Sequence, residues 1–121
     1  MRLKVVVICI LCLSSTMAGW SQKKELKKAV NYFDRGEYFL ALDFYKQAQE
    51  NGAVLDVNDK KRIARCYYHL NDIDNAFTSF SEIEGQLTGN DVFLYASTIH
   101  KFGFYEGAID WYEKSKSQGA N

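Results

Sequence analysis

Three side chains in the second half of the chain are of the types that catalysis or metal binding requires. Cys66 and His69 are three residues apart, which places them on one face of a helix, and His100 lies further along. A nucleophilic pair also needs an orienting group and an oxyanion hole, and the sequence shows neither. A structural zinc site uses about four ligands. We therefore expect near-core packing of these residues, with no catalytic residue, no metal, no cofactor and no enzyme activity.

A second group of residues offers charge instead of nucleophiles. Lys61 and Arg65 are four apart and are therefore neighbours on a helix, and Lys101 follows in the next third of the chain. Together they could make a groove positive and favour an acidic peptide or a terminal carboxylate. The alternative is a solvated helix face whose charge is balanced by Asp56 and Asp59.

The elements that would position these residues follow from an internal repeat. The stretches RGEYFLALDFY (35–45) and FGFYEGAIDWY (102–112) share the same spacing of Gly, Tyr, Ala and Tyr. A third copy, LNDIDNAFTSF (70–80), lies between them, so the copies are offset by 35 and 32 residues. Self-similarity at this period is typical of stacked repeat proteins.

Each copy predicts two helices joined by a tight turn. Gly36, Asn71 and Gly103 stand where the chain must leave one helix and start the next. Apolar residues recur at helical spacing on both sides of each turn, and the sequence contains no proline. Small residues on the facing helices let them approach closely. We expect helices at 22–35, 38–51, 57–70, 73–85, 90–102 and 105–118.

Two helix starts have candidate capping residues. Asp56 or Asn58 can cap the helix expected at 57–70, and Thr88 or Asn90 the helix expected at 90–102. The turn-rich linkers Asn51-Gly52 and 85–90 separate the hairpins.

At these positions the sequence resembles the tetratricopeptide (TPR) repeat family. The matching residues are Ala29, Tyr32, Gly36, Tyr38, Ala41, Tyr45 and Ala48; then Ala64, Tyr67, Asn71, Ala76 and Phe80; then Ala96, Ile99, Gly103, Ala108 and Tyr112. The early Trp and late Pro of the family are missing in all three copies. The resemblance implies an all-α, right-handed superhelical solenoid of three hairpins over residues 22–118, with repeats at about 22–55, 57–88 and 89–118. An unrelated amphipathic helical bundle is the alternative.

The resemblance also implies a function. Proteins of this family bind a protein or peptide along a concave groove lined by the first helix of each hairpin, so we expect an adaptor or scaffold. The recurring groove positions also include Lys23, Leu26, Val30 and Asn90. Leu26, Val30 and Phe33 fit the core equally well. The candidate partner-binding residues are Phe33, Asp34, Asn58, Lys61, Arg65, Tyr68, His69, Phe93, Ser97, His100 and Lys101.

The first nineteen residues have a different character. Arg2 and Lys4 precede a short apolar run, Val5 to Leu13, and small residues follow. This order is typical of a secretory signal peptide cleaved near Ala18 or Gly19. We therefore expect export to the periplasm or association with the outer membrane; an uncleaved membrane anchor is the alternative. Formal net charge is zero, which gives no indication of a nucleic-acid partner.

The end of the sequence predicts an uncovered surface. Phe104 and Trp111 lie away from the small-residue stripe of the helix expected at 105–118, and no polar capping helix follows. Either the chain is part of a longer protein, or this end meets a partner or a second copy. The second possibility makes the repeats a structural spacer or assembly module. The layout loosely resembles the N-terminal part of Gram-negative envelope proteins with an OmpA-like C-terminal domain.

Overall fold

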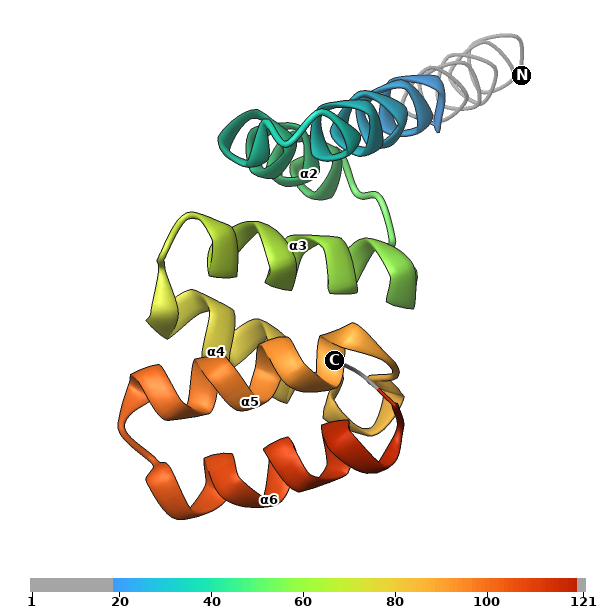
Figure 1. Ribbon diagram of the computed structural model, residues 1–121. Helices are drawn as coiled ribbons and strands as arrows, with labels where there is room; N and C mark the ends of the chain where they lie inside the picture. The colour runs from blue at the N-terminus through green and yellow to red at the C-terminus, as the bar shows by residue number, and fades with distance from the viewer. Residues whose placement is uncertain (1–18, 120–121) are drawn as a thin grey trace, which may run out of the picture. The chain divides into compact units, whose positions relative to one another are not determined.

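A computed structural model describes residues 19–119, and all regular structure within them is helical (Figure 1). These residues form six α-helices and one short 3-10 helix, and they contain no strand. The chain divides into two compact units, one ending at Val54 and the other beginning at Leu55. The expected all-α class is confirmed. The predicted signal peptide lies almost wholly outside the described residues.

The first unit is a helical hairpin. Its first helix covers residues 19–34, and α2 spans Tyr38–Glu50. Gly36, in the turn between them, has a φ of 76°, the left-handed conformation that glycine adopts without strain. The amide of Gly36 donates to the carbonyl of Phe33 at 2.9 Å, which closes the end of the first helix. The turn therefore falls where the sequence predicted it.

Small and aromatic side chains pack in the first unit. Ala29 and Ala41 are fully buried, as is Ala48 near the end of α2. The ring of Tyr32 stacks on that of Phe44, with 5.3 Å between centroids. Small residues therefore occupy the interior and aromatic rings pack beside them, in the arrangement that the repeat predicts.

The second unit contains two hairpins. α3 (Val57–His69) and α4 (Ile73–Ser81) form the first, and α5 (Asn90–Phe102) and α6 (Tyr105–Ser117) the second. A 3-10 helix, η1 (Glu84–Gln86), lies between them.

The turns inside these hairpins follow the sequence prediction. Asn71 has a φ of 59°, and Gly103 one of 103°. Asparagine is the non-glycine residue that most readily takes this left-handed conformation. Both residues therefore end their helices where the repeat indicated.

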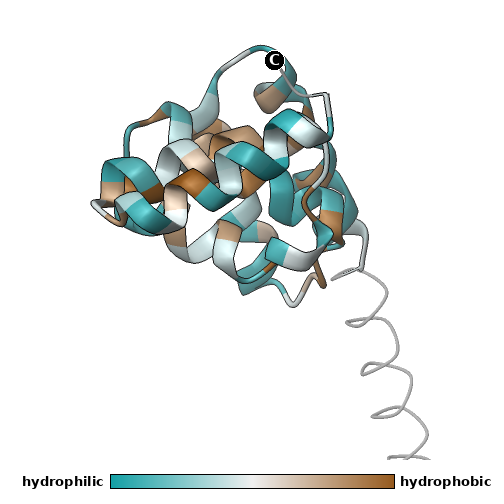
Figure 2. Cartoon of the chain, turned by 60° about the horizontal axis from the view of Figure 1, so that its bottom comes forward, coloured by the Kyte–Doolittle hydropathy of each residue, from teal (hydrophilic) through white to brown (hydrophobic). Residues whose placement is uncertain are grey.

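The core of the second unit gathers residues from α3, α4, α5, α6 and the η1 region. Phe80 is fully buried, and its ring lies 5.8 Å from that of Tyr95. The small residues Ala64, Ala76, Ala96 and Ala108 are at most 2% exposed. Apolar and polar residues alternate around the helices, as amphipathic packing requires (Figure 2). The predicted burial of Ala41, Ala76 and Ala108 is confirmed.

The fourth helix is shorter than expected. The sequence predicted 73–85, but α4 ends at Ser81. The hydroxyls of Thr78 and Ser81 donate to carbonyls four residues earlier, at 3.0 and 2.7 Å, a pattern that weakens helices. Gly85 adds a poor helix former just beyond. The chain continues through η1 instead.

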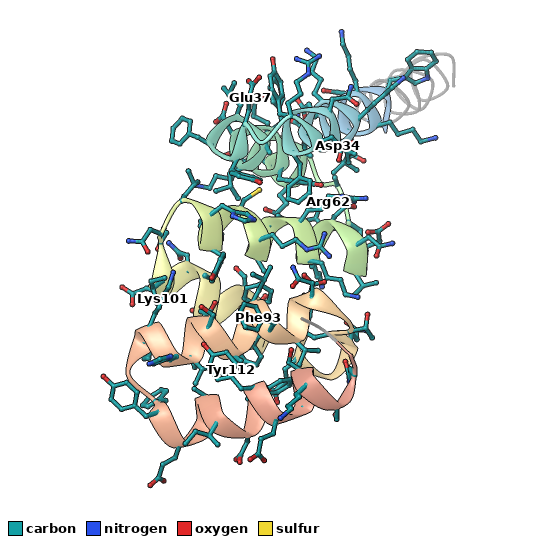
Figure 3. The ribbon with its side chains drawn as sticks, in the orientation of Figure 1. Asp34, Glu37, Arg62, Phe93, Lys101 and Tyr112 are labelled. Atoms are coloured by element: carbon teal, nitrogen blue, oxygen red, sulfur yellow. The ribbon has the colours of Figure 1, made fainter. Side chains whose placement is uncertain are left out.

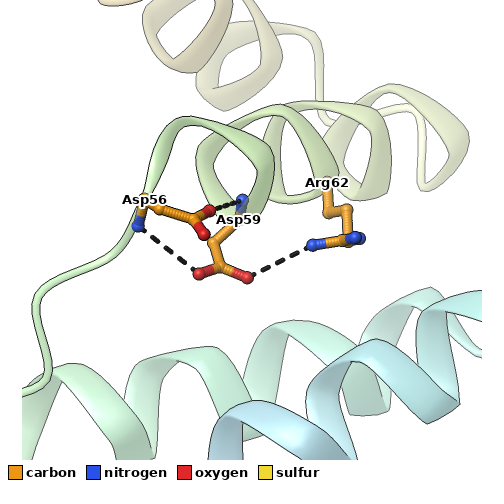
Figure 4. A network of polar contacts seen from close by, with 3 residues as sticks. All are labelled: Asp56, Asp59 and Arg62. Carbon is orange, nitrogen blue, oxygen red and sulfur yellow. Dashed lines mark hydrogen bonds and ion pairs between the residues drawn. The ribbon is translucent and has the colours of Figure 1, made fainter.

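One of the two predicted caps is confirmed. Asp56 accepts from the amide of Asp59 at 2.8 Å, and Asp59 accepts from the amide of Asp56 at 3.4 Å, so the two form a capping box (Figure 4). The prediction for α5 is wrong. Gly89 occupies the N-cap position with a φ of 58° and caps through its backbone, so neither Thr88 nor Asn90 is the cap.

Candidate functional site: the α3–α5 groove

A polar hollow lies in the second unit between α3 and α5. Its volume is about 450 Å³. Four of the predicted groove residues line it from α3, namely Asn58, Lys61, Arg65 and His69. The opposite wall is formed by Thr88, Asn90, Asp91 and Leu94. We call this surface the α3–α5 groove.

An ion pair joins the two walls of the groove. Nε of Arg65 donates to Oδ1 of Asp91 at 2.6 Å, and Nη2 of Arg65 donates to Oδ2 at the same distance. The side chain of Asp91 is only 4% exposed, whereas that of Arg65 is 33% exposed. The hydrogen bonds to Asp91 raise the pKa of Arg65 further above its usual range. The guanidinium is therefore committed to this bidentate pair.

The remaining polar groups of the groove face its opening. Lys61 is half-buried, and Asn58 and Asn90 are exposed. Within residues 19–119, Lys61 has no ion-pair partner. An ammonium group and two carboxamides can donate hydrogen bonds to carbonyl or carboxylate oxygens. The groove can therefore bind the backbone of an extended segment through these three side chains.

Tyr68, which does not line the hollow, makes a second set of contacts between α3 and α5. Its hydroxyl lies 3.0 Å from Oγ of Ser97, and Nζ of Lys101 lies 4.7 Å from the centre of its ring. A cation over an aromatic face is attracted electrostatically. These three predicted residues therefore lie together, and they tie α3 to α5 a second time.

His69, next to Tyr68 in α3, lines the groove. Its ring meets that of Tyr68 edge-on at 5.6 Å. Partial burial, and then the charge of Arg65, lower the pKa of His69 below its usual value. Its imidazole is therefore biased toward the neutral form, which can accept as well as donate.

Two predicted groove residues of α5 lie against α6 instead. The ring of Phe93 is 5.6 Å from that of Tyr112, and the two side chains come from the facing helices α5 and α6 (Figure 3). His100 lies 5.5 Å from Tyr105 and 6.1 Å from Tyr112. Phe93, Ser97 and His100 are four and three residues apart and so share a face of α5, but neither Phe93 nor His100 lines the hollow.

The two predicted residues of the first copy lie in the other unit. Phe33 is half-buried and packs edge-on against Tyr38 at 5.7 Å. Asp34 is the last residue of the first helix and is exposed.

Sequence reasoning missed Thr88, Asp91 and Leu94. A signal for Asp91 was present, because it follows Asp59 by 32 residues, the same offset as Ala108 from Ala76. Asp59 is buried as well, and it pairs with Arg62 at 3.3 Å. The repeat thus placed a carboxylate at the start of two helices, and only the structure shows that the second carboxylate reaches Arg65.

Nucleophilic chemistry has no support at Cys66. The thiol is fully buried, and burial raises its pKa to about 12, so the reactive thiolate is strongly disfavoured. Among residues 19–119, no cluster of three or more His, Cys, Asp or Glu side chains could hold a metal ion. Within the same range, no helix is both long and apolar enough to span a bilayer.

Comparison with known proteins gave no relative. No family model matches the chain, and no match was found among the curated proteins or the solved structures.

Proposed function

We propose that the chain is a protein-interaction module that holds a protein or peptide segment in the α3–α5 groove. The observation that carries this proposal is the convergence of Asn58, Lys61, Arg65 and His69, named from the sequence alone, on one hollow. Both walls are helices fixed by packing and by the Arg65–Asp91 pair. Fixed helix walls favour binding of a segment, since little backbone freedom is lost.

The balance of charges in the groove indicates the kind of segment. Asp91 neutralises Arg65, and the charge of Lys101 lies over the ring of Tyr68. Lys61 is then the main cation available to a ligand. We therefore propose a mildly acidic segment, recognised mostly through its backbone carbonyls, and not a ligand held by several carboxylate contacts.

The finer architecture and location belong to the same proposal. We propose a right-handed solenoid of three TPR-like hairpins, supported by the buried alanines at the repeated positions. Export to the periplasm or the outer membrane is supported by the basic, apolar and small-residue order of the leader. A segment of an envelope protein is then the proposed partner.

Peptide selection tests the groove. Peptides are selected from a displayed random library against the full chain, and the affinity of the best is measured by calorimetry for the parent and for two variants. Lys61→Glu lies in the groove, whereas Lys46→Glu makes the same charge change on the exposed face of α2. We expect Lys61→Glu to weaken binding about tenfold or more and Lys46→Glu to leave it nearly unchanged. Equal affinities for all three proteins would contradict the groove assignment.

A second candidate function is favoured by the surface of α6. Tyr105 is 65% exposed and Ile109 is 56% exposed, so α6 presents apolar side chains to solvent. In the preceding repeat, the residue that corresponds to Ile109 is Phe77 of α4, which is half-buried and stacks on Phe102 at 4.5 Å. An assembly module that docks through α6 would cover these side chains. A change of oligomeric state on Ile109→Lys, with groove variants unaffected, would favour this function.

A further inference from the structure

A second hollow in the second unit has an aromatic lining. It lies between α4, α5 and α6 and has a volume of about 630 Å³. Phe77, Tyr95, Phe104 and Trp111 contribute rings to its wall. This volume is in the range of sites that accept a bulky apolar group. The groove residues Asn58, Lys61 and Arg65 play no part in it.

One carboxylate lines this hollow, and two more lie on the same helix. Glu106 lines it, and Asp110 and Glu113 are exposed on the same helix. Lys114 is held over the ring of Trp111, with Nζ at 4.4 Å from the ring centre. An apolar hollow with Glu106 in its lining and Asp110 one turn further along α6 fits an aromatic side chain flanked by cations.

The first helix of the same chain carries such a group. Trp20 is 83% exposed. Lys23, Lys24 and Lys27 line a hollow with it, because residues three, four and seven apart share one face of a helix. Ala29, on another side of this helix, is fully buried, so the Trp20 face is not the one that packs within the unit.

We propose that the Trp20 face of one copy docks on the aromatic hollow of a second copy. The indole of Trp20 fills the hollow between α4, α5 and α6, and the lysines beside it pair with Glu106 and Asp110. Anchoring by a buried aromatic residue, with charge pairs around it, is the usual composition of a strong contact.

The geometry of such a contact has a consequence for assembly. The two surfaces differ, so each copy uses its Trp20 face on one neighbour and its hollow on another. Head-to-tail contacts of this kind generate a ring if the rotation closes and an open chain if it does not. The inference extends the assembly function and is independent of the α3–α5 groove.

Charge exchange tests the contact in the full chain. Analytical ultracentrifugation over a range of protein concentrations compares the parent with Glu106→Lys/Asp110→Lys and with Lys23→Glu/Lys27→Glu. All four substituted residues are exposed, so we expect the variants to fold like the parent, and circular dichroism checks this. Residues 1–18 are identical in every protein, so any association that they cause is common to all.

We expect the parent to associate with rising concentration and to dissociate with added salt. Each double variant should need about tenfold more protein to associate. An equal mixture of the two double variants should recover the parent behaviour, because each reversed surface then meets its reversed partner. Trp20→Ala should also weaken association without a change of charge.

Three results would overturn the proposal. One is a parent that stays monomeric at every concentration. Another is a mixture that associates no better than its components. The third is loss of binding to vesicles rich in phosphatidylglycerol in the lysine variant, with no self-association of the parent, since that result would assign the Trp20 face to a lipid surface.

Discussion

The two sides of α5 in the second unit are built from different chemistry. Toward α3, its contacts are polar, with Asp91 on Arg65 and Ser97 on Tyr68. Toward α4 and α6 they are aromatic, and Tyr95 lies 5.8 Å from Phe80 and 4.7 Å from Trp111. One helix thus belongs to a ligand-sized polar groove on one side and to the core on the other.

The two sides of α5 should therefore contribute differently to stability. Burial of rings contributes stability that scales with the apolar area removed from water. Paired charges contribute little net stability, because the free-energy cost of removing them from water offsets much of their attraction. They do fix the geometry of the groups that they join. Substitutions on the aromatic side of α5 should therefore unfold the unit, and substitutions on the polar side should chiefly change binding.

Removal of a ring from the core should have the largest effect. Phe80 is fully buried in α4 and contacts Tyr95. We expect Phe80→Ala to lower the free energy of unfolding by about 3–5 kcal/mol, since it leaves a cavity. Urea denaturation followed by circular dichroism measures the change. A loss below about 1 kcal/mol would contradict the assignment of this side of α5 to the core.

Loss of the charge pair should have a smaller effect on stability and a distinct effect on binding. Asp91→Asn leaves Arg65 without its carboxylate, and we expect about 2 kcal/mol less stability. The released guanidinium should also tighten the binding of acidic peptides to the groove. Asp110→Asn, an exposed change of the same kind on α6, should change stability by less than about 0.5 kcal/mol. A tighter-binding Asp110→Asn, or an unchanged Asp91→Asn, would contradict the comparison.

The helix positions were largely predictable because the repeat fixes them. Asn71 and Gly103 adopt the left-handed conformation expected of turn residues, and α5 has the predicted bounds. The burial of Ala76 and Ala108 followed from their equivalent places in two copies. A repeat in the sequence predicts these positions because each copy forms the same helical hairpin and packs in the same way.

The details of the groove were less predictable. The partner of Arg65 is 26 residues away, and nothing in the spacing selects Asp91 over the other carboxylates nearby. Phe93 and His100 were assigned to the groove by family position; in the structure their rings lie beside that of Tyr112 on α6, and neither lines the hollow. The hydroxyl-to-carbonyl bonds of Thr78 and Ser81 near the end of α4 cannot be predicted from a hydrophobic pattern.

The N-cap of α3, Asp56, gives a pH-dependent test of stability. The hydrogen bond from the Asp59 amide is the main cause that lowers the pKa of Asp56 below 3.8. The cap therefore contributes stability above the unfolded pKa and loses it as the pH falls through the lower folded value. We expect Asp56→Ala to cost about 1 kcal/mol at pH 7 and less at about pH 2, where more of the carboxyl group is protonated. Urea titrations at the two pH values measure this, and an equal cost at both would contradict the capping role.

The imidazole of the groove should give the smallest effect. Burial lowers the pKa of His69 below 6.5, so protonation is easier in the unfolded chain than in the folded one. The stability that the neutral imidazole of His69 contributes is fully present above about pH 6.5, and it is lost as the pH falls through the folded pKa. His69→Gln should remove this slope between about pH 7 and 5, with a change within about 0.5 kcal/mol. A steeper slope in the variant would contradict the direction.

Chemical-shift mapping tests the central claim most directly. The amide spectrum of the isotope-labelled chain is recorded during titration with a peptide selected for binding. The groove account predicts the largest shifts at Asn58 and Lys61 of α3 and at Asn90 of α5. It predicts small shifts around Phe77 and Trp111. Shifts concentrated at Phe77 and Trp111, with Asn58 and Lys61 unmoved, would contradict it.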